Sequence, residues 1–168
     1  MRDEQREAFE RFCREEYPNV VRAAYLITGD CEEALDVAQE AFVRSYQRWR
    51  QVSTMNAPAW WVTKVAANLA ISWRRRQRLR RREGGDAGTV LAALDPEPVG
   101  DDVMAALATL TPAQRTVVVL RLFADQSVDQ TATALGKRPG TVRALTSQAM
   151  SLLREFFDVE EVNDDARR

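Results

Sequence analysis

The sequence predicts an all-α protein with two helical domains joined by a linker. Apolar side chains recur three and four residues apart, which is the period of amphipathic helices. Residues 84–100 break this pattern with four Gly and two Pro. A length of 168 residues allows one domain or two small ones. We therefore expect a first domain over residues 5–83, a flexible linker over residues 84–100, a second domain over residues 101–157 and an acidic tail over residues 158–168.

The composition argues against several classes of function. No apolar run approaches the length of a membrane span, and no charged-then-apolar leader opens the chain. Histidine is absent, and Cys13 and Cys31 form no metal-ligand pattern. Without His, most nucleophile–base catalysis is disfavoured. We expect a cytoplasmic protein that binds no metal, cofactor or membrane and is not an enzyme.

The net charge of −1 conceals four unequal blocks. Residues 1–83 carry +4, residues 84–102 carry −5, residues 103–155 carry +3 and residues 156–168 carry −3. The two basic bodies are joined by an acidic linker and followed by an acidic tail. This distribution of charge suits a nucleic-acid-binding protein despite a pI near 5.7. Arg supplies 22 of the 24 basic residues, and its planar fork suits phosphates and guanine edges. Codon bias in a GC-rich genome is an alternative explanation that the sequence leaves open.

Two helices are expected before residue 51. The first covers residues 7–28, with a kink or break at Pro18. Gly29 suits its C-cap and Asp30 the next N-cap. The second helix covers about residues 31–50, and the spacing of its apolar residues predicts a buried stripe of Leu35, Ala38, Phe42, Tyr46 and Trp49.

A second face of this helix is mainly polar. Asp36, Gln39, Glu40 and Val43 follow at i, i+3, i+4 and i+7, so they share one side. The pattern alone favours plain solvated surface over a partner site.

The helix around which we expect the first domain to be organised covers residues 57–82. Asn56 suits its N-cap, and Pro58 falls in the first turn, where a missing N–H costs little. Apolar residues occur on nearly every face, which is typical of a buried helix at the centre of a bundle. They are Trp60, Trp61, Val62, Val65, Leu69, Ile71 and Trp73.

The second half of this helix is strongly cationic. Seven of nine consecutive residues are arginine, namely Arg74, Arg75, Arg76, Arg78, Arg80, Arg81 and Arg82. Cations that complement the helix dipole would explain one or two of them. Seven favour a surface that faces phosphates.

The second domain has the pattern of a helix-turn-helix. After a helix over residues 101–110, Thr111 is expected to cap a helix over residues 112–123 that buries Val117, Val118, Leu120 and Leu122. Ser127 then caps residues 128–135, Gly136 makes the turn, and a last helix begins at Pro139 and ends near Phe157. A generic three-helix packing is the alternative.

The last helix is expected to divide into two faces. Val142, Leu145, Ala149, Leu152 and Leu153 are expected to pack inward. The outward set is Arg138, Thr141, Arg143, Ala144 and Ser147, with the helix N-terminus presented to DNA.

Five segments together resemble the extracytoplasmic-function (ECF) sigma factors of bacterial RNA polymerase, with most similarity to the SigE-like actinobacterial subfamily. They are residues 24–30 (AYLITGD), 33–42 (EALDVAQEAF), 61–68 (WVTKVAAN), 110–121 (LTPAQRTVVVLR) and 140–143 (GTVR). In the family they correspond to AyLLtGD, eAeDlvQEaF, W-x-x-x-I-A-x-N, LpprqR-x-v-v-v-L-R and G-T-V-K. The order and spacing of these motifs cover nearly the whole chain outside the linker and tail.

This resemblance implies partners and site residues. It implies two domains, sigma region 2 and sigma region 4, that bind the clamp helices and flap of core RNA polymerase, and a possible anti-sigma partner. Asp36, Gln39 and Glu40 would bind the clamp helices. The −10 promoter element would meet Asn56, Trp60, Trp61, Lys64, Asn68, Arg74, Arg75, Arg76 and Arg78. The −35 element would meet Arg138, Thr141, Arg143 and Ser147.

Several positions depart from the family pattern. Ser72 stands where many members have Asp, and Arg138 replaces the usual capping Ser. Ala144, Leu145 and Gln148 occupy positions that are usually Ser, polar and Arg. These changes leave the fold intact and put the strength and sequence preference of −35 recognition in question.

We therefore predict a sigma factor that directs promoter-specific transcription initiation. The first alternative is a helix-turn-helix regulator that binds DNA without polymerase. The second is an arginine-rich RNA-binding or ribosome-associated protein.

Overall fold

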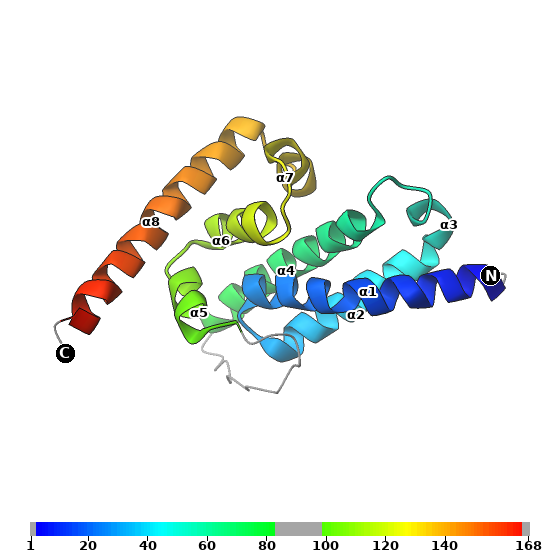
Figure 1. Cartoon of the computed structure of the whole chain (residues 1–168), viewed down its shortest axis with the longest axis horizontal. Helices are drawn as coiled ribbons and strands as arrows, with labels where there is room; N and C mark the ends of the chain where they lie inside the picture. The colour runs from blue at the N-terminus through cyan, green and yellow to red at the C-terminus, as the bar shows by residue number, and fades with distance from the viewer. Residues whose placement is uncertain (1–2, 83–98, 166–168) are drawn as a thin grey trace. The chain divides into compact units, whose positions relative to one another are not determined.

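The computed structural model describes the backbone of residues 3–82 and 99–165, and the side chains of residues 3–77 and 99–158. The chain divides into two compact units, unit 1 (residues 1–96) and unit 2 (residues 97–168). Within the described ranges every regular element is a helix (Figure 1). The predicted all-α class is confirmed. No described helix is long and apolar enough to cross a membrane.

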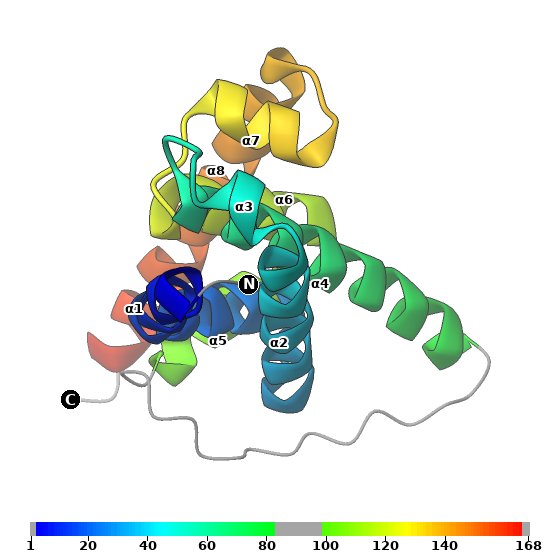
Figure 2. The ribbon, with the colours of Figure 1, turned by 90° about the vertical axis from the view of Figure 1, so that its right-hand side faces the viewer.

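Unit 1 is a bundle of three long helices and one short one (Figure 2). They are α1 (Asp3–Thr28), α2 (Cys31–Gln47), α3 (Trp49–Val52) and α4 (Pro58–Arg82). The three long helices each pack on the other two. Their shared core contains Val20, Ala24, Ile27, Ala34, Ala38, Val62 and Ala70, all fully buried.

The boundaries in unit 1 differ from the predictions at three places. A break at Pro18 is wrong: α1 continues through this exposed residue. The second helix stops at Gln47 because Arg48 leaves helical geometry, with φ −113° and ψ 16°. Helix α4 begins at Pro58, and the Ala57 carbonyl accepts its first hydrogen bond. Asn56 is therefore not the N-cap.

Helix α4 lies against both α1 and α2, as predicted, but its aromatic residues do not form the core. Val62, Ala66, Ala67 and Ala70 are buried, whereas Trp60, Trp61 and Trp73 are only partly buried. Small side chains let three helices meet closely, and the larger indole rings remain at the edge of the contact.

Aromatic rings join the first half of α1 to the corner between α2 and α3. Phe9 and Phe12 each contact the Trp49 ring with 5.1 Å between centroids. Phe12 also packs on Phe42 at 5.9 Å. Tyr46 touches Phe9 by its edge, yet its side chain is 47% exposed, so its predicted burial is wrong. The cluster fixes the start of α1 onto the corner.

Unit 2 is built from short helices and one long one. They are α5 (Asp101–Ala108), α6 (Pro112–Val118), the π-helix η1 (Val119–Phe123), α7 (Val128–Leu135) and α8 (Pro139–Asp165). Val117, Ala132 and Val142 form the core of the α6–α7–α8 packing.

The predicted start and stop signals of unit 2 are confirmed. Thr111 and Ser127 each form a capping box, with Gln114 and Gln130 respectively. Gly136 ends α7 with φ +59°, a left-handed conformation that glycine adopts without strain. Pro139 is the first residue of α8.

Three expectations for unit 2 are corrected. Leu122 is 58% exposed because the chain changes from α- to π-helical geometry at Val119, and the wider turn rotates the residues that follow. Leu152 is 37% exposed. Helix α8 continues past Phe157 to Asp165, so most of the predicted tail is helical. The predicted linker falls almost wholly on residues 83–98, outside the described residues.

Candidate nucleic-acid and protein interfaces

The polar face of α2 is held on a fixed helix. The Asp30 carboxylate accepts a hydrogen bond from the Glu33 N–H at 3.0 Å and caps the helix start. Asp36, Gln39 and Glu40 are all exposed, on the side opposite the buried Ala34 and Ala38.

An exposed apolar residue accompanies these polar groups. Val43 is 49% exposed on this face. Glu40 Oε1 accepts a hydrogen bond from Arg44 Nε at 2.8 Å. The face thus combines carboxylates, an amide and one exposed apolar side chain.

The start of α4 carries a line of larger polar and aromatic side chains. Trp61, Lys64 and Asn68 follow at intervals of three and four residues, so they lie on one side of the helix. Lys64 and Trp61 are partly buried, and Asn68 is exposed. Trp60 is partly buried at the helix start, and Asn56 is exposed in the loop before it. The structure thus places the first five residues of the predicted −10 set along the first turns of α4 and in the preceding loop, and the arginines of that set lie farther along the same helix.

The arginine run is not uniform. Arg74 Nη1 donates a hydrogen bond to the Ile27 carbonyl at 2.7 Å, at the C-terminal end of α1. A cation suits this position because the last carbonyls of a helix lack intrahelical partners. Arg75 and Arg76 are exposed, and the side chain of Arg78 lies outside the described side chains. The first arginine therefore ties α4 to α1, and the next two face solvent.

The outward face of α8 agrees with the predicted pattern. Thr141, Arg143 and Ser147 on α8 are all exposed, as is Arg138 directly before the helix. On the opposite side, Val142 and Ala149 are fully buried. The turn at Gly136 joins α7 to α8 as a helix-turn-helix, and both helices pack on Val117. Within the described part of unit 2, this arrangement leaves one face of α8 uncovered.

The individual motifs do not reveal one feature of the sequence, a long segment without any acidic residue. Residues 41–82 contain eleven Lys and Arg residues and no Asp or Glu. This acid-free segment includes the end of α2, all of α3 and α4, and the loop between them. A search for carboxylate-free stretches, instead of arginine clusters alone, would have found it.

The thiols of both cysteines have raised pKa values. Burial, and secondarily the nearby Glu10 carboxylate, raises the pKa of the Cys13 thiol to about 11. Burial also raises the pKa of the Cys31 thiol, with a further increase from Asp30 and a partial offset by a hydrogen bond with Tyr25. Within residues 3–82 and 99–165, no group of three or more His, Cys, Asp or Glu side chains is placed to hold a metal ion.

Comparison with known protein families decides the identity of both units. Residues 12–80 match Sigma-70 region 2, and residues 100–153 match Sigma-70 region 4. The chain belongs to the sigma-70 family. The two matches fall one in each unit and together cover most of the chain.

Named relatives place this sigma factor in the ECF group. It is 31% identical to the RNA polymerase sigma-E factor of Streptomyces avermitilis, over 95% of this chain and 89% of that protein. It is 35% identical to the ECF RNA polymerase sigma factor SigL of Mycobacterium tuberculosis, over 79% of each chain.

Solved structures share the fold. The sigma factor RpoE of Bartonella quintana, solved in complex with the anti-sigma factor NepR, superposes with a TM-score of 0.75 at 19% identity. The match covers 91% of this chain and 98% of that one. At this identity the likeness concerns the fold alone.

Proposed function

We propose that this sigma factor binds core RNA polymerase and directs it to promoters, with unit 1 at the −10 element and unit 2 at the −35 element. The observation that carries the proposal is that each unit presents an exposed face suited to one of these tasks. Unit 1 has the polar face of α2 and the acid-free α3–α4 segment. Unit 2 has the outward face of α8. Because this sigma factor is proposed to bind RNA polymerase, we expect to find it in the cytoplasm.

The polar face of α2 is proposed to bind the clamp helices of polymerase. Asp36, Gln39 and Glu40 are exposed on the side of α2 opposite the buried Ala34 and Ala38, so replacing them should not disturb folding. Changing all three to Ala should weaken the binding of core polymerase about tenfold or more, because the truncation of even one hot-spot residue costs about 2 kcal/mol or more. A titration of labelled sigma factor with core enzyme measures the loss.

A matched control removes the same charge from another helix. Glu7 and Glu15 are exposed on α1, and the double change to Ala should leave polymerase affinity unaltered. Undiminished affinity of the triple variant, with normal thermal stability, would refute the role of this face.

The two DNA-facing helices are proposed to act by different means. Arg75 and Arg76 on α4 would contact phosphates, together with Arg78, because closely spaced cations offer charge more than base-edge geometry. On α8, Arg143 would read base edges in the major groove, while Arg138, Thr141 and Ser147 position the helix.

Salt titrations of holoenzyme on promoter DNA separate these two roles. Changing Arg75 and Arg76 to Gln should weaken all promoters about equally and reduce the salt slope by roughly one per lost contact. Arg143→Ala should cost about 1–3 kcal/mol on the preferred −35 sequence and less on a mutated one. Equal loss on both −35 sequences would mean that Arg143 does not read bases.

Promoter-dependent run-off transcription with core enzyme tests the proposal as a whole. The expected result is a defined transcript that requires both the sigma factor and the promoter. A helix-turn-helix regulator that acts alone would leave core polymerase behind in a pull-down, and an RNA-binding protein would give no run-off product. Either result would overturn the proposal.

An anti-sigma factor is a further proposed partner. The support is the fold shared with RpoE, which was solved with NepR bound. Exposed apolar residues in each unit, including Val43 and Leu122, offer surface to such a protein.

A further inference from the structure

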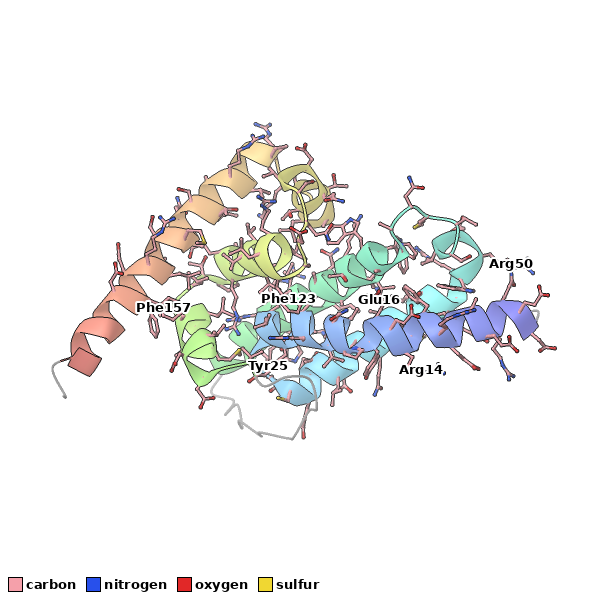
Figure 3. All side chains as sticks on the ribbon, viewed as in Figure 1. Arg14, Glu16, Tyr25, Arg50, Phe123 and Phe157 are labelled. Carbon is pink, nitrogen blue, oxygen red and sulfur yellow. The ribbon has the colours of Figure 1, made fainter. Side chains whose placement is uncertain are left out.

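The last part of α8 lies outside the region that matches the family. The Sigma-70 region 4 match ends at residue 153, whereas α8 continues to Asp165. This part of the helix extends past α6 and α7 (Figure 1), and Phe157, labelled in Figure 3, lies on it. It belongs to none of the faces assigned above to polymerase or promoter DNA, so its role is open.

An apolar stripe leads along α8 into this part of the helix. Its members follow one another at intervals of three, four, three and four residues, and they are Val142, Leu145, Ala149, Leu152 and Phe156. This is the heptad spacing by which one helix packs along another. The stripe is covered at its start, where Val142 and Ala149 are fully buried in unit 2.

The far end of the stripe is uncovered. Leu152 is 37% exposed, and Phe157, the neighbour of Phe156, is 41% exposed. The rings of Phe156 and Phe157 pack edge to face with 5.5 Å between their centroids, so each ring restrains the other. Exposed apolar side chains that continue a buried stripe are typical of a surface on which another helix docks.

The charge of the chain changes sign at the same place. Residues 130–154 contain four Lys or Arg and no Asp or Glu, whereas residues 155–165 contain six Asp or Glu and no Lys or Arg. The boundary falls between the leucine pair of residues 152–153 and the phenylalanine pair of residues 156–157. Glu155 and Asp158 are exposed and form no ion pair with any described residue.

These charges decide among the occupants that the apolar end of α8 could accept. Nucleic acid is disfavoured because Glu155 and Asp158 would repel its phosphates. The chain before α5 is disfavoured for the same reason, since residues 84–102 carry −5. A second copy of this chain fits if its α8 runs in the opposite direction, because each acidic half then approaches the basic half of the other helix. Parallel helices would bring like charges together.

We propose that two copies of this chain pair through the ends of their α8 helices, which run antiparallel about a two-fold axis near the boundary between Arg154 and Glu155. This symmetry brings the leucine pair of each helix to the level of the phenylalanine pair of the other. Each apolar substitution therefore affects the interface twice. A single short helix pair lies at or below the low end of stable interfaces, about 1,200 Å², so the dimer is weak and reversible.

Pairing in this way leaves the outward face of α8 uncovered in both copies. Arg143 and Ser147 are exposed on that face, whereas Ala149 at the start of the pairing stripe is buried on the other side of the helix. The proposal therefore does not depend on what the outward face binds, and it can fail or succeed independently of promoter recognition.

Sedimentation equilibrium of the full chain tests the pairing. Loading concentrations from about 5 to about 200 μM cover the range expected for a weak dimer. The measurement gives the dissociation constant of the dimer at low and at high salt. Circular dichroism of each variant verifies that its helices are intact.

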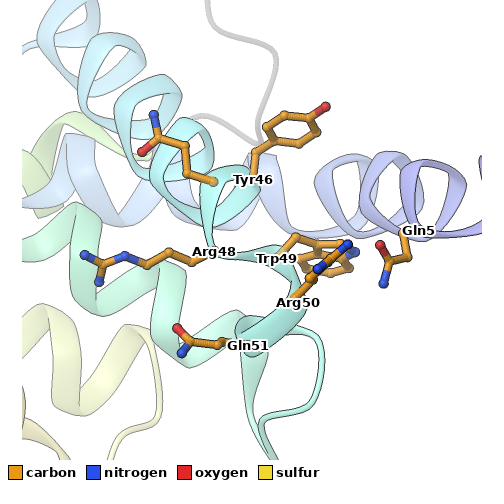
Figure 4. Close-up of a pocket in the computed structure, with 7 residues that line it drawn as sticks. Gln5, Tyr46, Arg48, Trp49, Arg50 and Gln51 are labelled. Atoms are coloured by element: carbon orange, nitrogen blue, oxygen red, sulfur yellow. The ribbon is translucent and has the colours of Figure 1, made fainter. Parts of the chain in front are cut away.

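The apolar contact is tested first. Phe157→Ala should weaken the dimer about tenfold or more, and Leu152→Ala about fivefold or more, because each change acts on both copies. Two exposed apolar residues away from the end of α8 provide controls. Leu122 on η1 is 58% exposed, and Tyr46 is 47% exposed beside a pocket of unit 1 (Figure 4). Leu122→Ala and Tyr46→Ala should leave the dissociation constant unchanged.

The direction of the helices is tested by charge. Changing Glu155 and Asp158 together to Gln should weaken the dimer about threefold and reduce its sensitivity to salt, because antiparallel helices place these acids near basic residues. Glu7 and Glu15 are exposed on α1, and changing both to Gln is the matched control. It should alter neither quantity.

The results separate the proposed dimer from the alternatives. A dimer that is weakened by Phe157→Ala and by loss of the two acids supports the proposal. A chain that stays monomeric at every concentration overturns it and leaves the apolar end of α8 to a different protein. Equal effects of Phe157→Ala and Tyr46→Ala would place the contact elsewhere, and a tighter dimer without the two acids would indicate parallel helices. Either of these results also overturns the proposal.

Discussion

In unit 1 the three main helices are long and the residues at their closest approach are small, whereas in unit 2 helices α6 and α7 are short and each begins with a capping box. Helices α1 and α4 have 26 and 25 residues. The residue before α4 is Ala57, whose side chain cannot cap the helix. Helices α6 and α7 have seven and eight residues, and each begins with a capping box. Isolated helices shorter than about 12–15 residues are marginal in water, so caps matter most in unit 2.

A second contrast concerns the arginines of α4 and α8, the two helices that we propose contact DNA. On α4, Arg74 is used to hold the end of α1. On α8, Arg143 is exposed, and packing depends on Val142 and Ala149 instead. On α4, one arginine of a dense run makes a structural contact, and its neighbours are left for the proposed phosphate contacts. On α8, which has few cations, the packing residues and the proposed binding residues lie on separate faces.

The distribution of tryptophan allows the two units to be followed separately. All four Trp residues, Trp49, Trp60, Trp61 and Trp73, lie in unit 1. Tryptophan fluorescence therefore reports the unfolding of unit 1, and far-ultraviolet circular dichroism reports both units. Urea titrations with both probes give the free energy of unfolding for each variant below.

The largest expected effect is in the core of unit 2. Leu120 is fully buried, so Leu120→Ala should lower the free energy of unfolding of this unit by about 2–5 kcal/mol. Leu122→Ala, only two residues away but 58% exposed, should change it by less than about 0.5 kcal/mol. The dichroism transition should shift for Leu120→Ala and the fluorescence transition should not. Equal effects at the two positions would contradict the π-helical geometry of Val119–Phe123.

A smaller effect is expected at the contact between α4 and α1. Arg74→Gln removes a charged donor from the Ile27 carbonyl and should destabilise unit 1 by about 1.5–3 kcal/mol. Arg75→Gln removes the same charge from an exposed position and should cost less than about 0.5 kcal/mol. Fluorescence-detected unfolding in urea makes the comparison. If both variants are equally stable, Arg74 has no structural role.

The smallest effect concerns the caps. Ser127→Ala removes the capping box of α7 and should cost unit 2 about 1 kcal/mol. Asn56→Ala should change the stability of unit 1 by less than about 0.5 kcal/mol, because α4 begins two residues later and Asn56 is exposed. A loss of about 1 kcal/mol in the free energy of unfolding for Asn56→Ala would show that Asn56 caps α4 after all.

Local signals proved sufficient for much of the fold. Caps at Asp30, Thr111 and Ser127 and the left-handed turn at Gly136 depend on residues within four positions of one another, so a single sequence contains the necessary information. The exposure of the candidate site residues on α2 and α8 likewise followed from helical periodicity. The roles of those residues remain predictions.

What the sequence determined by itself was the helical class, the division into two bodies, the signals that begin and end most helices, and the family. The tertiary structure alone decided which apolar residues of α4 are buried, since Ala66 and Ala70 occupy the contact and the indoles lie at its edge. It also decided that Arg74 holds the Ile27 carbonyl, 47 residues away in the chain. Periodicity identifies a face of one helix, but which residues of that face are buried depends on the distance and shape of the neighbouring helices, which no local pattern specifies.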